Sequence, residues 1–220
     1  MADLEFSCRY DREHAERYLR KHQAGFARRV SNWRDMQVAR KALLLADEPD
    51  SVLDLPCGAG RFWPLLAEQA GRKIIAADSS ADMLTVAWNA QPLDVIKRVR
   101  LLYTSAFAID LPDNAVDSIF SMRLLHHISD RTNRLALLKE FHRVTRDSLI
   151  ISLWVDGNLK SLRRKRTEAT RPRRAYQNRF VMPVREIEAE FAQSGFSVQQ
   201  HIDHVPFLQM WRVYVLRKSL

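Results

Sequence analysis

The chain has 220 residues, of which 46% are hydrophobic, and it carries a net charge of +9. This length suits one α/β domain with a sizeable core and is short for two, and the hydrophobic content excludes a disordered chain. The two cysteines, Cys8 and Cys57, share no metal-ligand spacing, so neither a disulfide framework nor a metal site is expected. The first residues are too polar for a signal peptide, and no apolar run reaches the length of a membrane span. We therefore expect a cytoplasmic protein, which acts in solution or at the inner face of a membrane.

The chain begins with a region of helical character. Residues 11–46 favour helix, with Ser31 as a plausible N-cap and Pro49 closing the region. We predict that residues 1–48 form an N-terminal helical lid, from which Tyr10 reaches the site.

From residue 51 the pattern changes to alternating strands and helices. Apolar runs rich in Val, Ile and Leu predict strands at 51–55, 72–78, 99–105, 116–122 and 147–155. Amphipathic segments predict helices at 60–70, 80–91, 130–145 and 183–195, and two closing strands follow at 196–205 and 211–218. This order predicts an α/β fold over residues 49–220, a doubly wound sheet whose ligand lies beyond the carboxyl ends of the central strands.

The positive charge is concentrated in one insertion of this domain. Residues 157–180 hold two lysines and seven arginines against one glutamate, which is +8 of the net +9. Guanidinium groups suit phosphates and carboxylates, so we predict an anion-binding insertion. Its candidate residues are Arg163, Arg164, Arg166, Arg171, Arg173 and Arg174. The alternative for a charge run of this kind is a solvated, flexible loop.

The stretch SVLDLPCGAG, residues 51–60, joins the first strand to the following helix. A glycine-rich turn there brings backbone N–H groups close to a ligand, and Gly58 and Gly60 permit close approach and positive φ. Pro56 has no N–H and a fixed φ, which is acceptable if its position needs neither a donor nor positive φ. In that case the donors come from Cys57 to Gly60. The alternative is an ordinary turn between a strand and a helix.

Asp78 ends the second predicted strand, 24 residues after Asp54. An acidic residue at this place can accept both ribose hydroxyls of an adenosine-containing ligand. The alternative is an N-cap for the next helix, a role that Ser79 or Ser80 could also fill.

The loop, Asp78 and the later stretch LPDNAVDSIFSMRLLHHI together resemble the class I S-adenosylmethionine-dependent methyltransferases, most closely the ubiquinone/menaquinone-type group. The resemblance covers about residues 50–155. It implies a Rossmann-like seven-stranded sheet, mostly parallel with an antiparallel last strand. It also implies S-adenosylmethionine as cofactor and S-adenosylhomocysteine as product.

The same resemblance implies roles for single residues. Asp54 would orient the loop or meet the amino group of the cofactor, and Asp78 would hold its ribose. Ser79 and Met83 would border the adenine, and Ser121 would lie near the methionine part. Arg34, just before the first strand, is the candidate partner of the cofactor carboxylate.

Two positions depart from the pattern of this family. Pro56 stands where the first glycine is usual. Phe107 stands where many members have an aspartate that accepts from the adenine amino group. Phenylalanine can pack on the ring but cannot accept that hydrogen bond, so the backbone of Ala106 and Ala108 would have to help.

Methyl transfer requires alignment of the nucleophile with the methyl group, exclusion of water, and a base only where the nucleophile is protonated. His126 and His127 follow the fourth predicted strand and, with Tyr10, are the candidate catalytic residues. For His126 the alternative is a structural role that braces the loop.

These observations favour a methyltransferase that acts on a small or lipid- or sugar-linked, anionic acceptor, such as a phosphorylated glycolipid or a nucleotide. A second hypothesis is a regulatory binding module of the same fold, whose arginine-rich insertion binds a phosphorylated nucleotide signal such as a cyclic dinucleotide, or a partner. A third is an RNA methyltransferase, which no NPPY-like or catalytic-cysteine motif supports.

Overall fold

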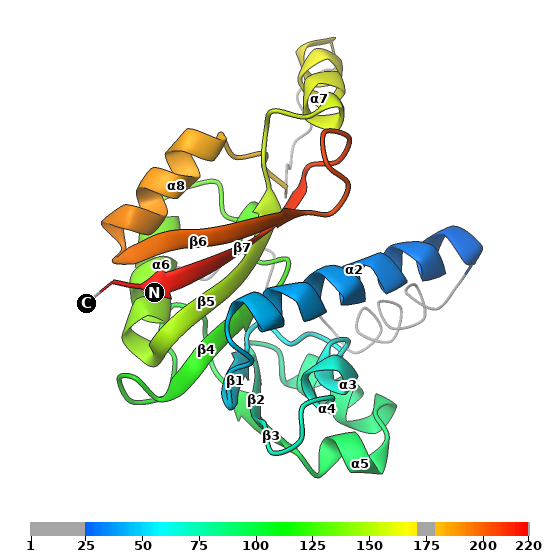
Figure 1. Cartoon of the computed structure of the whole chain (residues 1–220), viewed down its shortest axis with the longest axis vertical. Helices are drawn as coiled ribbons and strands as arrows, with labels where there is room; N and C mark the ends of the chain where they lie inside the picture. Colours follow the sequence, from blue (N-terminus) through cyan, green and yellow to red (C-terminus); the bar gives the residue numbers. More distant parts are fainter. Residues whose placement is uncertain (1–24, 171–178, 220) are drawn as a thin grey trace.

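The computed structural model describes residues 25–170 and 179–219, and its centre is one seven-stranded sheet with the order β3-β2-β1-β4-β5-β7-β6 (Figure 1). The strands are β1 (Ser51–Asp54), β2 (Lys73–Asp78), β3 (Val99–Tyr103), β4 (Val116–Ser121), β5 (Thr145–Trp154), β6 (Phe196–Asp203) and β7 (Trp211–Lys218).

The sheet has the mixed pairing that the sequence predicts. β1 to β5 run parallel to one another, whereas β7 pairs antiparallel with both β5 and β6. Asp54 is in register with Ala76 on one side and with Phe120 on the other, which places the end of β1 at the centre of the carboxyl edge. The predicted doubly wound sheet with an antiparallel last strand is confirmed.

Helices cover both faces of the sheet (Figure 1). Those described are α2 (Phe26–Leu45), α3 (Trp63–Leu66), α4 (Ala81–Ala90), α5 (Leu93–Ile96), the 3-10 helix η2 (Leu125–His127), α6 (Arg131–Val144), α7 (Leu159–Thr170) and α8 (Val184–Gln193). Successive residues of a strand point to opposite faces, so Val52 joins a core with α2, α3 and α4, and Leu53 joins a core with α6 and α8.

Two predicted details of the helices are wrong. α2 begins at Phe26 and runs through Ser31, which therefore caps nothing. The helix predicted at 60–70 is only the single turn α3. Pro64 is tolerated only in the first turn of a helix, so α3 cannot begin much earlier. At its end the carbonyls of Leu66 and Ala67 accept from the side chains of Arg72 and Arg98, which stops the helix.

The basic insertion begins and ends at the carboxyl end of β5. Its first part is the helix α7 rather than a loop, and α7 projects beyond the sheet at the top of Figure 1. The chain returns through Met182, whose N–H donates to the carbonyl of Trp154 at 2.8 Å. Within the described ranges, no helix combines the length and apolarity needed to cross a bilayer.

Candidate functional site

Two buried carboxylates lie together at the centre of the carboxyl edge. Asp54 is the last residue of β1 and Asp78 the last of the neighbouring β2. Burial raises the pKa of Asp54 well above its usual range, and the charge of Asp78 raises it further. Both Oδ atoms of Asp54 are buried without a hydrogen bond at bonding distance from the described residues, and the nearby indole N–H of Trp63 offsets the rise in pKa only in part. A pair of carboxyl groups with this little compensation favours a cationic ligand.

Asp78 binds backbone groups on both sides. Its Oδ2 accepts from the N–H of Gly58 at 2.9 Å, and its Oδ1 from the N–H of Ser80 at 3.0 Å. Burial raises its pKa, and the N–H of Gly58 partly offsets that effect. The N-cap of α4 is Ser80, whose hydroxyl accepts from the N–H of Met83 at 3.2 Å. Asp78 is therefore not needed as a cap, and a carboxylate has lone pairs left for further donors.

The loop after β1 needs its two glycines. Gly58 and Gly60 have φ values of 53° and 70°, the left-handed region in which glycine is unstrained. A Cβ on Gly60 would lie 2.9 Å from the Trp63 ring, so this glycine allows close packing inside the protein. A Cβ on Gly58 would meet nothing within 4 Å, so the backbone at Gly58 borders open space that a ligand can enter.

The expectation that Cys57 to Gly60 supply free donors is wrong for three of these residues. The N–H of Cys57 donates to the carbonyl of Ala77 at 2.8 Å, and that of Gly60 to the carbonyl of Cys57 at 3.1 Å. The N–H of Gly58 is bound to Asp78, as described above. The Leu55–Pro56 peptide bond is cis. Burial raises the pKa of the Cys57 thiol. The site around this loop therefore presents the carboxyl groups of Asp54 and Asp78 rather than a row of free amides.

The residues predicted to border an adenine lie beyond β2 and β3. Ser79 is exposed, whereas Met83 is buried on α4. Phe107 is half-buried and packs against the core on the α6 side. The N–H of Phe107 donates to the Ser105 hydroxyl at 3.2 Å and that of Ala108 to the Ser105 carbonyl at 3.2 Å, so both donors are bound within the loop.

Ser121 and Arg34 have different surroundings. Ser121 ends β4 next to β1, and its buried hydroxyl has no hydrogen-bond partner among residues 25–170 and 179–219. Arg34 lies on α2, and its Nε donates to the carbonyl of His204 at 2.8 Å. That bond ties α2 to the turn after β6.

A half-buried acid that sequence reasoning did not single out, Asp35, lies next to Arg34. Its Oδ2 lies 2.5 Å from Nη2 of Arg61 and 2.5 Å from Nη2 of Arg123. Its Oδ1 lies 3.1 Å from Nε2 of His204. Burial would raise the pKa of Asp35, but the bond from His204 and the charges of Arg123 and Arg61 outweigh it and hold this pKa well below its usual range. Asp35 thus joins α2 to the first loop, to the end of β4 and to the turn after β6.

An aromatic cluster forms the other side of the carboxyl edge. Trp154, at the end of β5, is directly opposite Trp211 of β7, with ring centroids 5.6 Å apart. His126 of η2 packs edge-on against Trp211 at 4.8 Å and beside Trp154 at 5.2 Å. Burial lowers the pKa of His126 to about 2, and His127 and the nearby arginines add to this shift. His126 is therefore neutral near pH 7 and is a weak base, while its neighbour His127 is half-buried.

Guanidinium groups surround these rings. Arg164 of α7 lies over Trp154 at 5.0 Å and Arg179 over the same ring at 5.6 Å. Arg123 lies over Trp211 at 5.2 Å, and its backbone has a φ of 66°, which is rare for a residue with a side chain. Unusual backbone of this kind is concentrated at functional sites.

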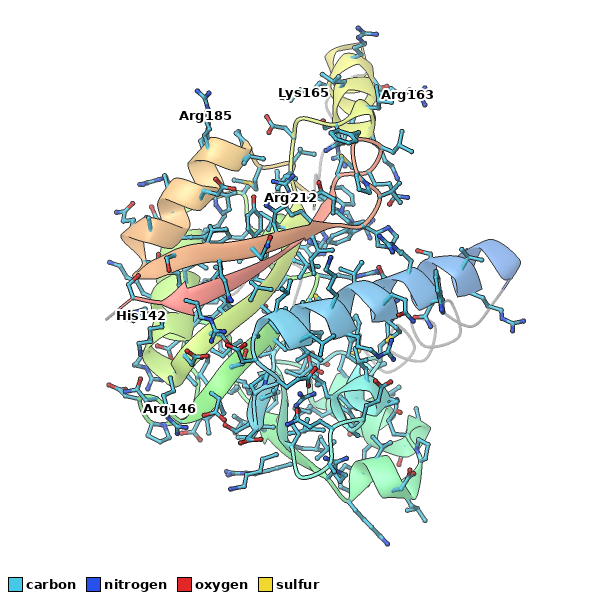
Figure 2. All side chains as sticks on the ribbon, in the orientation of Figure 1. His142, Arg146, Arg163, Lys165, Arg185 and Arg212 are labelled. Carbon is cyan, nitrogen blue, oxygen red and sulfur yellow. The ribbon has the colours of Figure 1, made fainter. Side chains whose placement is uncertain are left out.

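The predicted anion-binding arginines separate into two groups. Arg164 turns back onto Trp154, whereas Arg163 and Arg166 are exposed on α7. Figure 2 shows Arg163 projecting outward from α7, whereas Nζ of Lys165 lies 3.6 Å from Oδ2 of Asp156. The predictions for Tyr10, Arg171, Arg173 and Arg174 fall outside the described residues.

Sequence reasoning missed Asp35, Arg61, Arg123 and the two tryptophans. A weak signal existed for Trp154, because a large aromatic residue ends an otherwise aliphatic strand. No local signal pointed to Asp35, because its partners lie 26, 88 and, for His204, 169 positions further along the chain.

Comparisons with known proteins agree with this architecture. A family model described as "Methyltransferase domain" matches residues 53–151. The chain is 32% identical over 126 residues to the chloroplastic 2-phytyl-1,4-beta-naphthoquinone methyltransferase of Arabidopsis thaliana, a match that covers 55% of this chain and 46% of that protein. It is 34% identical over 126 residues to the malonyl-[acyl-carrier protein] O-methyltransferase of Pectobacterium atrosepticum, covering 55% and 45%. These matches span just under half of the length of those relatives.

Solved structures show the same fold over nearly the whole chain. The crystal structure of magnesium protoporphyrin IX methyltransferase from Synechocystis PCC 6803 with bound SAH superposes with a TM-score of 0.74 at 17% identity. The match covers 93% of this chain and 94% of that one. At this identity the likeness concerns the fold alone.

Proposed function

Since this chain carries a class I methyltransferase domain, we propose that it is an S-adenosylmethionine-dependent methyltransferase whose acceptor is a small molecule with a negative charge. When bound, the cofactor supplies a methyl group activated on a sulfonium. The two relatives are named for a naphthoquinone and for a malonyl group on a carrier protein, which supports a small acceptor group.

The observation that carries the proposal is the buried pair of Asp54 and Asp78. A ligand that bears an ammonium and a sulfonium compensates two carboxylates that share a low-dielectric site. The Oδ atoms of Asp54, which accept no hydrogen bond at bonding distance from the described residues, are the groups that such a ligand would satisfy. A Cβ at Gly58 would meet nothing within 4 Å, so the protein leaves the backbone of the loop uncovered at this point.

The residues at the carboxyl edge then divide the task of holding the cofactor. Asp78 accepts the ribose hydroxyls with the lone pairs that Gly58 and Ser80 leave, and Ser79, Met83 and Phe107 border the adenine. Asp54 faces the cationic groups, as does the hydroxyl of Ser121 on the neighbouring strand, which has no hydrogen-bond partner within residues 25–170 and 179–219. Arg34 remains the candidate for the cofactor carboxylate, because Arg61 and Arg123 already bind the carboxylate of Asp35.

The acceptor side is proposed from the aromatic cluster. Trp154 and Trp211 offer flat apolar surface, and Arg123, Arg164 and Arg179 bring positive charge to it. Planar guanidinium groups bind carboxylates and phosphates well, which supports an anionic acceptor, free or linked to a lipid or sugar.

The protonation state of His126 narrows the chemistry. With a pKa of about 2 it is not suited to accept a proton near pH 7, so its role is to pack the end of β4 against Trp154 and Trp211. His127 remains the candidate base. An acceptor atom that is already ionised, such as a carboxylate oxygen, needs no base.

The N-terminal lid stays part of the proposal. Its described portion, α2, is tied across the carboxyl edge through Asp35 and Arg34. A cover in this position excludes water from the reacting groups, as methyl transfer requires.

Calorimetric titration with S-adenosylmethionine tests the function. Wild-type protein should bind it, and Asp78→Asn should weaken binding by about a hundredfold, because two charge-assisted hydrogen bonds are lost. The matched control is Asp82→Asn, which removes the same charge from an exposed residue four positions later and should bind normally. No binding by the folded wild-type protein, or equal binding by both variants, contradicts the proposal.

One observation favours a second candidate, the regulatory binding module. The N–H groups of Cys57, Gly58 and Gly60 are all bound within the protein, which weakens the usual phosphate- or cofactor-binding role of such a loop. Incubation with methyl-labelled cofactor and a small-molecule extract distinguishes the two. Label that appears in an anionic product supports the enzyme, and cofactor binding without any transfer supports the module.

A further inference from the structure

The turn between β6 and β7 and the start of α7 form one unit at the far end of the molecule. The N–H of Leu159 donates to the carbonyl of Phe207 at 2.9 Å, and that of Lys160 to the carbonyl of Leu208 at 3.2 Å. In Figure 1 this turn lies against the base of α7 at the top, away from α5 at the bottom. The two segments therefore present one joint surface.

This surface is apolar to a degree that folding does not require. The exposed fractions are 83% for Phe207, 53% for Leu162, 52% for Leu208 and 50% for Leu159. We call these four residues the apical patch. Single exposed hydrophobic residues are common, but a contiguous group marks a surface that is covered in use.

The backbone of Phe207 has a conformation that is unfavourable for a bulky residue. Its φ is 60°, a region that is strained for a bulky residue and comfortable for glycine or asparagine. A phenylalanine that is both strained and almost fully exposed contributes little to the stability of this chain. Strain of this kind is retained where it serves a function.

The base of the unit is firmly built. Asn158 and Ser161 are buried, and the Ser161 N–H donates to Oδ1 of Asn158 at 2.9 Å. Nδ2 of Asn158 donates to the carbonyl of Val155 at 2.8 Å, which fastens the start of α7 to the end of β5. The apical patch is thus an exposed surface on a fixed support.

Positive charge borders the apical patch. Leu159, Leu162, Arg163 and Arg166 follow the spacing i, i+3, i+4, i+7, so they share one face of α7. Arg163 and Arg166 are exposed there, and Lys160 is exposed at the first turn. Figure 2 shows Arg163 extending outward from this helix. Apolar side chains among long basic ones are typical of surfaces that lie in the headgroup region of a bilayer.

We propose that the apical patch and the basic face of α7 dock on a membrane surface that carries anionic lipids. Phe207 and the leucines enter the headgroup boundary, while the arginines stay at the level of the lipid phosphates. Arg164 of the same helix lies over Trp154, so docking brings the carboxyl edge of β5 next to the lipid surface. A nucleic acid would use the arginines but has no use for exposed leucines, which favours the lipid surface.

Sedimentation with vesicles tests the proposal. Vesicles of phosphatidylcholine with about one quarter phosphatidylglycerol should bind the wild-type protein, and pure phosphatidylcholine should bind it much less. Arg163→Gln combined with Arg166→Gln should weaken binding by about thirtyfold. Phe207→Asn should weaken it by about tenfold, and it should fold at least as well as wild type because asparagine suits a positive φ.

Matched controls lie at the opposite end of the molecule. Leu93→Asn changes a residue of α5 that is 74% exposed, and Lys97→Gln combined with Arg100→Gln removes two exposed charges. All should bind vesicles like wild type. Asp78→Asn should also bind vesicles normally, so a failure of the proposed cofactor site is distinguishable from a failure of this surface.

Two outcomes overturn the proposal. One is equal binding to vesicles with and without phosphatidylglycerol, or none to either. The other is normal vesicle binding by Phe207→Asn together with tight binding of a single-stranded RNA oligonucleotide that the arginine variant alone abolishes, which would assign α7 to nucleic acid.

Discussion

The carboxyl edge of the sheet has two sides with opposite electrostatic character. At β1 and β2, Asp54 and Asp78 are buried without a cationic side chain to compensate them among the described residues. At β4, β5 and β7, arginines lie over tryptophan rings and a histidine is held neutral. One side lacks positive charge, and the other has a surplus of it.

This difference shows how one site can bind two ligands of opposite charge. Each side carries the charge that its proposed ligand lacks, a cationic cofactor on one and an anionic acceptor on the other. Asp35 is the exception, because it is an acid on the basic side. Its pKa is held below the usual range while that of Asp54 is raised, so the same residue type has opposite energetics within one site.

Substitution of Asp35 should have the largest effect on the free energy of unfolding. We expect Asp35→Asn to lower the free energy of unfolding by about 3 kcal/mol, because it leaves Arg61 and Arg123 without their carboxylate. The depressed pKa of Asp35 makes its stabilisation present above the unfolded value near pH 4, and it is lost as the pH falls further. Urea unfolding near neutral pH and in acid measures both effects.

The control for that variant is Asp47→Asn. Asp47 also pairs with an arginine, Arg217, but its side chain is exposed. Its loss should cost less than about 1 kcal/mol. Equal effects of the two substitutions would show that the ion pairs of Asp35 stabilise the fold no more than an exposed ion pair does.

Substitution of Asp54, on the acidic side of the carboxyl edge, should stabilise the protein rather than destabilise it. We expect Asp54→Asn to raise the free energy of unfolding of the cofactor-free protein by about 1 kcal/mol at neutral pH, and to weaken cofactor binding by about tenfold. The pKa of Asp54 is raised in the folded protein, so buried Asp54 does not reduce the free energy of unfolding in acid, where it is protonated in both states. The reduction grows as the pH rises above about 4, because Asp54 then ionises in the unfolded chain first.

Unfolding of Asp54→Asn and wild type at about pH 5 and about pH 8 tests the sign, since the gain should be larger at the higher pH. Asp110→Asn, at an exposed position, is the control and should change neither stability nor binding. A loss of stability in Asp54→Asn would mean that the carboxylate has a partner within the folded protein.

On the basic side, neighbouring arginines of α7 should differ. Arg164→Gln removes the cation over Trp154 and should lower the free energy of unfolding by about 1 kcal/mol. Arg163→Gln changes an exposed residue of the same helix and should leave stability unchanged. Urea unfolding followed by tryptophan fluorescence compares them, and equal midpoints for the two variants would remove Arg164 from the cluster.

The smallest effect is expected for the titration of His126. With a pKa of about 2, its ring should show no change of nitrogen chemical shift by NMR between about pH 5 and about pH 8. A histidine that titrates in this range and disappears in His126→Gln would contradict the neutral state and restore His126 as a candidate base.

The sheet was the most predictable part of the protein. The runs 72–78 and 116–122 contain consecutive apolar residues, Ile74 to Ala77 and Ile119 to Phe120, which point to opposite faces of the sheet. A strand of this kind needs helices on both sides. The placement of Asp54 and Asp78 followed as well, because parallel strands bring their carboxyl ends to one edge. The length of α3 was not predictable, because Arg72 and Arg98 end it through side chains that reach across from other segments.

What the sequence by itself determined is therefore the order of strands and helices, the two acids at neighbouring strand ends and the glycines that turn the loop. These depend on periodicity and on residue type, which are local properties. Only the tertiary structure decided that the amides of the loop are bound internally, that Asp35 collects two arginines and a histidine, and that α7 stands beside Phe207. Those outcomes depend on contacts between residues far apart in the chain, and burial then sets whether a charge there is compensated or not.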